Sequence, residues 1–253
     1  METLAVFHIL KNGGTTLVDR YKNNPTFVYQ RIYDEVAFNY KQSNQTRVEA
    51  DDCKDKNIRM IFGHGVDFSW DNILLNPIKY ATILRDPIAR MMSAYNYFRL
   101  EMATIHNHMT DIDFKTWLIN CDRVLPTPVF AQYQQFCDER YCRQQSLRID
   151  YGRKLNEYTQ TKLYDQALKN IDKLSYVLFM EDNYIEKFDL IASKFDLKAD
   201  TSVTHTHSTG KWLTDLGVDY INFNNLGNTE KELLMDTVAK DVEFYNYCKE
   251  KFV

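Results

Sequence analysis

The sequence lacks several features that mark particular classes of protein. No stretch approaches the roughly 18 consecutive apolar residues of a membrane-spanning helix. The first residues also lack the basic segment and the long apolar stretch of a secretory signal. The net charge of −4 and the pI of about 5.9 argue against a general nucleic-acid binder. We therefore expect a cytoplasmic protein without a membrane span and without a nucleic-acid partner.

Cysteine is scarce and irregularly placed. The five cysteines are an odd, scattered set, which is typical of reduced thiols, and none has the spacing of a zinc site. Cys137 and Cys142 could close a small loop by a disulfide or remain thiols. The chain also lacks internal repeats and linkers rich in proline, glycine or serine. We therefore predict a single domain over residues 1–253.

The apolar residues predict alternating strands and helices. Short apolar runs predict strands at residues 4–7, 25–29, 57–62, 78–84 and 175–180. Helical periodicity follows at 87–98, 114–118, 155–174, 184–195 and from 228 onward, whereas 38–57 and 201–227 are polar and predict loops. This alternation predicts an α/β fold, with a mainly parallel central sheet flanked by helices. Ligands bind such sheets at the carboxyl ends of the strands.

One glycine-containing loop has the layout of an anion site. Between the first predicted strand and a helix lies His8-Ile9-Leu10-Lys11-Asn12-Gly13-Gly14-Thr15-Thr16-Leu17. Glycines let the backbone approach a phosphate, and the N–H groups of a first helical turn favour negative charge. Lys11 adds a positive charge, and Thr15 and Thr16 add hydroxyl donors. In a Walker A loop the lysine follows the second glycine, whereas Lys11 precedes both, which argues against an ordinary ATPase or GTPase.

Two motifs together resemble the carbohydrate sulfotransferases, most nearly the group that contains the heparan sulfate 2-O-sulfotransferases. The loop is similar to H-I-P-K-x-G-G-T-[ST]-L, with Leu10 in place of proline. The family's second motif, R-D-P-x-x-R-x-x-S-x-Y, is matched in full by Arg85-Asp86-Pro87-Ile88-Ala89-Arg90-Met91-Met92-Ser93-Ala94-Tyr95. Weaker similarities are Gly63-His64 followed by Phe68, Phe179-Met180-Glu181 followed by Phe188, and the late segment Thr206-His207-Ser208-Thr209-Gly210-Lys211.

The resemblance implies a P-loop-like sulfotransferase fold and a donor, 3′-phosphoadenosine 5′-phosphosulfate (PAPS), with adenosine 3′,5′-bisphosphate as product. The 5′-phosphosulfate would be held by Lys11, Asn12, Gly13, Gly14, Thr15 and Thr16. Arg85 and Ser93 would hold the 3′-phosphate, and Ser208 and Lys211 belong to a loop that closes over the nucleotide. His64 would be the catalytic base and Lys11 would stabilise the leaving 5′-phosphate. The resemblance implies no metal, and it implies a hydroxyl-bearing acceptor as partner, a glycan or another small molecule.

Structural alternatives stand beside these roles. Gly13 and Gly14 could form an ordinary turn, Arg85 could pair with Asp86, and His64 could be a structural histidine. Ser93 could be a small helix residue, and His8 could orient the loop by a hydrogen bond. The remaining candidates are His106 and His108 as a nuclease-like pair or solvated loop, His205 and His207 in a lid, and residues 130–136 as acceptor cleft or core.

Two alternative functions remain at this point. An ATP-dependent kinase would need a carboxylate that holds Mg²⁺ near Thr15, and no Walker B pattern ends a strand. A non-catalytic protein that binds adenosine 3′,5′-bisphosphate would share the donor site but would not need the catalytic side chains of Lys11 and His64.

Overall fold

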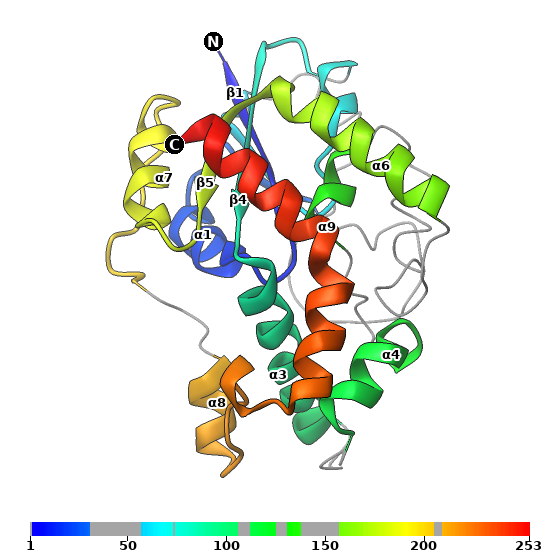
Figure 1. Cartoon of the computed structure of the whole chain (residues 1–253). Coiled ribbons are helices and arrows are strands. Elements are labelled where there is room, and N and C mark those ends of the chain that lie inside the picture. The colour runs from blue at the N-terminus through cyan, green and yellow to red at the C-terminus, as the bar shows by residue number, and fades with distance from the viewer. Residues whose placement is uncertain are drawn as a thin grey trace. The chain divides into compact units, whose positions relative to one another are not determined.

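The computed structural model describes residues 2–30, 57–72, 74–105, 112–124, 131–137, 157–204 and 209–253. The contacts divide the chain into two compact units, Met1–Leu84 with Lys173–Thr206, and Arg85–Asp172 with His207–Val253 (Figure 1). The prediction of one domain over residues 1–253 is untested and stays a prediction. Among the described helices, none is both long enough and apolar enough to cross a membrane.

The first unit is built on a parallel sheet. Its five strands have the order β2-β3-β1-β4-β5, and every neighbouring pair is parallel. The strands are β1 (Thr3–Phe7), β2 (Phe27–Gln30), β3 (Met60–Gly63), β4 (Ile78–Leu84) and β5 (Leu174–Phe179). The central strand β1 is buried along its whole length, which is why it is an almost continuous apolar run. The predicted α/β fold with a mainly parallel sheet is confirmed.

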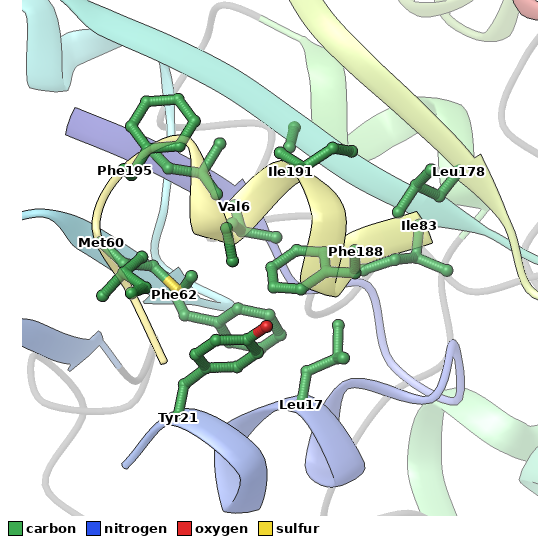
Figure 2. Packing of buried hydrophobic residues seen from close by; sticks show 14 of the residues in the cluster. Val6, Leu17, Tyr21, Met60, Phe62, Ile83, Leu178, Phe188, Ile191 and Phe195 are labelled. Carbon is green, nitrogen blue, oxygen red and sulfur yellow. The ribbon is translucent and has the colours of Figure 1, made fainter. Parts of the chain in front are cut away.

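Two helices cover one face of this sheet. Helix α1 (Gly14–Tyr21) contributes Leu17 and Tyr21, and helix α7 (Tyr184–Ser193) contributes Phe188 and Ile191. Figure 2 shows these side chains packed against residues that point out of the strands: Val6, Met60, Phe62, Ile83 and Leu178. Burying a side chain of this size stabilises the fold by about 1.5–3 kcal/mol. This cluster therefore fixes α1, and with it the loop that precedes α1.

The strand order brings two candidate loops to one edge of the sheet. Phe7 at the end of β1 pairs with Gly63 at the end of β3 and with Thr82 in β4. Because all these strands are parallel, the loops that follow β1 and β3 leave from the same edge. The chain moves from β1 to one side of the sheet and later returns to the other side to form β4. Such a switch point is where open parallel sheets bind ligands.

The second unit is mainly helical. Its helices are α3 (Pro87–Ile105), α4 (Phe114–Val124), α6 (Glu157–Asn170), α8 (Thr209–Asp215) and α9 (Asn228–Phe252). Figure 1 shows α3 and α9 side by side, and an apolar cluster with Phe98, Trp117 and Val238 joins α3, α4 and α9. Short 3-10 helices complete the described part of the chain, at Phe68–Asn72, Gln132–Phe136 (η3), Ile171–Lys173 and Phe223–Asn225.

Two sequence predictions of secondary structure were wrong in detail. The helix predicted over 155–174 ends at Asn170, whose side-chain amide donates to the Phe136 carbonyl at 2.8 Å, and β5 already begins at Leu174. The polar segment 201–227 contains α8, because Leu213 is buried against Leu100 and Val218. Of the loop predicted over 38–57, residues 38–56 lie outside the described residues.

Candidate functional site

The loop after β1 ends in a helix terminus that no side chain caps. Lys11 and Gly13 both have positive φ angles, 66° and 74°. Gly13 is the N-cap of α1, no side chain hydrogen-bonds to this cap, and the first turn carries no acidic residue. The first N–H groups of a helix have no acceptor within the helix, and the helix dipole favours an anion there. This terminus therefore has the chemistry of an anion site, with the partly exposed Lys11 beside it.

Both glycines of the loop are required by their surroundings. A Cβ atom on Gly13 would lie 2.5 Å from the Tyr184 hydroxyl oxygen, and a Cβ on Gly14 would lie 2.0 Å from His8 Nε2. The Tyr184 hydroxyl also donates to the Gly13 carbonyl at 3.3 Å. The turn is therefore held by Tyr184 from α7 and by the ring of His8. Neither contact can be read from the spacing of the sequence.

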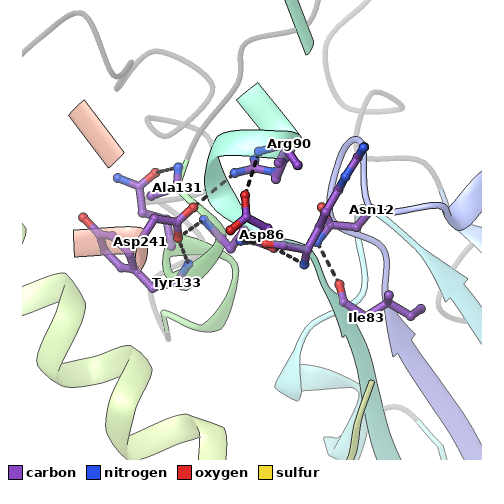
Figure 3. Close-up of polar contacts among 11 residues, drawn as sticks. Asn12, Ile83, Asp86, Arg90, Ala131, Tyr133 and Asp241 are labelled. Carbon is purple, nitrogen blue, oxygen red and sulfur yellow. Dashed lines mark hydrogen bonds and ion pairs between the residues drawn. The ribbon is translucent and has the colours of Figure 1, made fainter. Parts of the chain in front are cut away.

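Asn12 anchors the loop to the neighbouring strand. Its side chain is buried, and Nδ2 donates to the Ile83 carbonyl of β4 at 2.8 Å (Figure 3). Its backbone N–H donates to the Ile9 carbonyl at 3.2 Å. Of the two threonines, Thr15 is exposed at the start of α1 and Thr16 is buried. A direct contact of Asn12, Thr15 or Thr16 with a donor stays a prediction.

His64 is held in one defined orientation at the end of β3. Its Nδ1 lies within hydrogen-bond distance of the His8 carbonyl oxygen. A carbonyl oxygen can only accept, so Nδ1 of a neutral His64 carries the proton and Nε2 is left as the acceptor. The His64 ring stacks on the His8 ring, with centroids 4.0 Å apart and an interplanar angle of 19°. An imidazole with Nε2 unprotonated has the form that a general base requires.

His8 is a neutral partner in this stack. Its backbone N–H extends the β1–β3 pairing by a bond to the Gly63 carbonyl at 3.0 Å, and its ring contacts Phe62. Burial holds the pKa of His8 well below its ordinary value, and the nearby charges of His64 and Lys11 lower it further. Of the stacked pair, His8 is therefore a ring that disfavours a proton.

In the second unit, the backbone of Arg85 is clasped by one buried side chain. The Gln132 amide accepts from Arg85 N–H at 3.0 Å and donates to the Arg85 carbonyl at 2.7 Å. Asp86 caps α3, because its Oδ1 accepts from Ala89 N–H at 2.8 Å. Ser93 lies two turns into α3 and is 8% exposed. Backbone hydrogen bonds thus fix the point from which the Arg85 side chain extends.

A buried ion pair supports this clasp. Arg90 and Asp241 are both fully buried and lie 3.3 Å apart, from Nη1 to Oδ2 (Figure 3). The other oxygen of Asp241 accepts from the backbone N–H of Gln132 at 2.7 Å and of Tyr133 at 3.3 Å. Asp241 on α9 therefore holds both α3 and η3, the 3-10 helix that carries Gln132. Arg90, the second arginine of the R-D-P-x-x-R motif, therefore forms an ion pair inside the protein with Asp241.

The other predicted residues divide clearly. Ala131–Cys137 are all buried, with Phe136 stacked on Phe244, so this stretch is core, and Phe130 lies outside the described residues. Lys211 is exposed on α8. The remaining candidates lie outside the described residues: His106, His108, His205, His207, Ser208 and Cys142.

The first unit thus brings together the loop from His8 to Thr16 and the base candidate His64. Sequence reasoning missed Tyr184, Gln132 and Asp241, which position the predicted residues without belonging to a motif. Arg90 could have been singled out from the sequence, because it occupies a fixed position of the second motif. Comparison with protein-family models finds no match for this chain, and comparison with curated proteins finds none either. The likeness to sulfotransferases therefore rests on the sequence motifs alone.

Proposed function

We propose that this chain is a PAPS-dependent O-sulfotransferase of the carbohydrate sulfotransferase type. The observation that carries the proposal is the orientation of His64. Its Nδ1 donates a hydrogen bond to the His8 carbonyl oxygen, so its Nε2 is the proton acceptor. His8 is also the first residue of the loop that contains Lys11, Gly13 and Gly14. A phosphate-type loop and a neutral imidazole base at the same edge of the sheet are the two parts that sulfuryl transfer needs.

The chemistry divides between His64 and Lys11. The acceptor hydroxyl oxygen forms a bond to the donor sulfur while the bond from sulfur to the bridging 5′-phosphate oxygen breaks. His64 Nε2 takes the hydroxyl proton, which later passes to solvent. The products are a sulfate ester and adenosine 3′,5′-bisphosphate. Lys11 and the first N–H groups of α1 stabilise the negative charge that develops on the leaving phosphate, as in related phosphoryl transfers.

Arg85 and Ser93 are assigned to the 3′-phosphate of the donor. A guanidinium can bind a phosphate through two parallel hydrogen bonds, and a hydroxyl can add a third. The Gln132 clasp supports this role, because it fixes the backbone from which the Arg85 guanidinium extends. Lys211 and Ser208 are assigned to closure over the nucleotide. The acceptor is proposed to be a saccharide hydroxyl, on the strength of the family resemblance alone.

The donor assignment is tested by thermal unfolding with nucleotides. Adenosine 3′,5′-bisphosphate at one hundred times its Kd should stabilise the protein by about 2.7 kcal/mol, roughly 5–10 °C in Tm. AMP and ATP should shift Tm much less, because neither offers a 3′-phosphate to Arg85 and Ser93. Arg85→Ala should remove the difference between adenosine 3′,5′-bisphosphate and AMP, while Lys22→Ala, an exposed lysine of the first unit, should retain it. Equal shifts with all three nucleotides would refute the donor assignment.

Transfer itself is tested with labelled PAPS against a panel of glycans and small alcohols. His64→Ala should abolish labelling of the acceptor and leave the nucleotide shift in place, because His64 acts on the acceptor proton. Transfer that survives in His64→Ala would show that another base operates. A nucleotide shift without transfer to any acceptor would favour the non-catalytic binder. Phosphate transfer from ATP with Mg²⁺ would favour the kinase.

A further inference from the structure

The ring of His8 is in contact with both parts of the proposed site. It stacks on the His64 ring at 4.0 Å between centroids. It also lies so close to the first residue of α1 that a Cβ on Gly14 would be 2.0 Å from its Nε2. His8 is 7% exposed and His64 is 9% exposed, so solvent contributes little to the environment of the pair. One imidazole therefore separates the base from the backbone of the donor loop.

We propose that His8 is a positioning residue for His64: its ring holds the His64 imidazole with Nε2 as the proton acceptor and fixes that ring against the donor loop. The inference rests on the proposed function for its catalytic meaning. His64 is oriented twice, by the hydrogen bond from Nδ1 to the His8 carbonyl and by stacking on the His8 ring. The hydrogen bond alone fixes the position of Nδ1 but leaves the ring free to rotate about that bond. The stacking contact removes this freedom and so fixes the direction of Nε2.

The choice of an imidazole, rather than any flat ring, has a consequence for charge. Burial opposes a proton on His8 most, and two neighbouring groups in the described part of the chain, His64 and Lys11, oppose it further. When His64 has taken a proton, the neutral His8 ring stays in contact with the resulting imidazolium. A second proton on the pair would place two like charges at stacking distance, which costs free energy. The pair therefore opposes a second proton, and the lowered pKa of His8 keeps that ring neutral.

Nitrogen-15 NMR of the imidazole rings tests this arrangement without donor or acceptor. In the unmodified protein at neutral pH, His64 should show a protonated Nδ1 and an unprotonated Nε2. On titration from pH 8 to pH 5, His64 should gain a proton and His8 should stay neutral. His64→Gln identifies the His64 signals by their loss. A His64 with protonated Nε2, or a His8 that titrates before His64, would overturn the proposal.

Two substitutions separate positioning from simple packing. His8→Phe keeps a flat ring beside His64, and His8→Ala removes it. We expect His8→Ala to lower kcat for transfer by about 10²-fold, the cost of misplacing a catalytic group by about 1 Å, and to give His64 a mixture of tautomers. The Tm shift with adenosine 3′,5′-bisphosphate and the KM for PAPS should change little. His8→Phe should recover most of the rate and the single tautomer.

The outcomes distinguish this inference from the proposed function. If no acceptor is labelled and no nucleotide shifts Tm, the proposed function fails, while the NMR spectra still report whether His8 orients His64. If transfer occurs and His8→Ala retains full kcat with one His64 tautomer, the function stands and the positioning role is refuted. Circular dichroism shows whether each variant is folded. If neither variant folds, the nitrogen-15 NMR spectra of the unmodified protein still show which nitrogen of His64 carries the proton and whether His8 titrates before His64.

Discussion

Gly14→Ala is the substitution for which the structure makes the sharpest energetic prediction. The added Cβ would lie 2.0 Å from His8 Nε2 and 2.1 Å from His8 Cδ2, whereas carbon atoms pack at roughly 3.5–4.0 Å. The ring has little room to retreat, because the His64 and Phe62 rings lie 4.0 and 5.1 Å from it between centroids. Overpacking of this kind costs about 1–3 kcal/mol. This cost is partly offset, because replacing a helical glycine by alanine stabilises a protein by about 0.5–1 kcal/mol.

A double-mutant cycle separates the two contributions. In the unmodified background we expect Gly14→Ala to lower the free energy of unfolding by roughly 1 kcal/mol, the difference between the mid-range values of the two terms. In the background of His8→Ala the clash is gone, so Gly14→Ala should be neutral or slightly stabilising. Urea unfolding followed by circular dichroism gives each value from the midpoint and slope. An equal loss of stability in both backgrounds would refute the contact between Gly14 and His8 as the reason for the glycine.

Further predictions concern the buried ion pair and the stacked histidines. Asp241→Asn should cost about 3–5 kcal/mol in urea unfolding, because it removes the carboxylate charge that faces the fully buried Arg90 guanidinium. Arg90→Met combined with Asp241→Asn should recover part of this loss, since the amide oxygen can still accept from η3; a purely additive loss would contradict the pairing. The lowered pKa of His8 means that the unfolded chain binds more protons than the folded chain below the ordinary value of 6.5, so stability is full above that pH. It should fall by up to about 1.4 kcal/mol per pH unit between 6.5 and the lower pKa of folded His8. His8→Phe should flatten this part of the profile, and an unchanged slope would mean that another group is responsible.

The fold was predictable from the sequence because its signals are local. The apolar run at 78–84 is bounded by a proline and by the Arg85-Asp86-Pro87 turn, and it forms β4 with those bounds. The run predicted at 175–180 is shifted by one residue at each end from β5. The segment at 201–227 failed because α8 has seven residues, too few to show helical periodicity, and is stabilised by the burial of Leu213.

The residues that support the site could not be predicted in the same way. Gln132 contacts Arg85 across 47 positions of sequence, and Asp241 contacts Arg90 across 151. Contacts over such separations depend on tertiary packing, which leaves no period or spacing in the chain. The loop and His64 could be singled out because each follows a strand, and parallel strands place their carboxyl ends at the same edge of the sheet. The stacking of His8 on His64 required coordinates, although both histidines stood out in the sequence as candidates.

The central position of β1 affects when the loop that follows it can unfold. β1 is paired on both sides, and each of its five residues is buried. Amide hydrogens in such a strand exchange with solvent only when the whole unit opens, unlike those of edge strands, which fray at lower cost. A loop that begins directly after a buried strand paired on both sides is anchored to a part of its unit that opens only at a high cost in free energy. Heat or denaturant should therefore not release the base of the loop before the sheet itself unfolds.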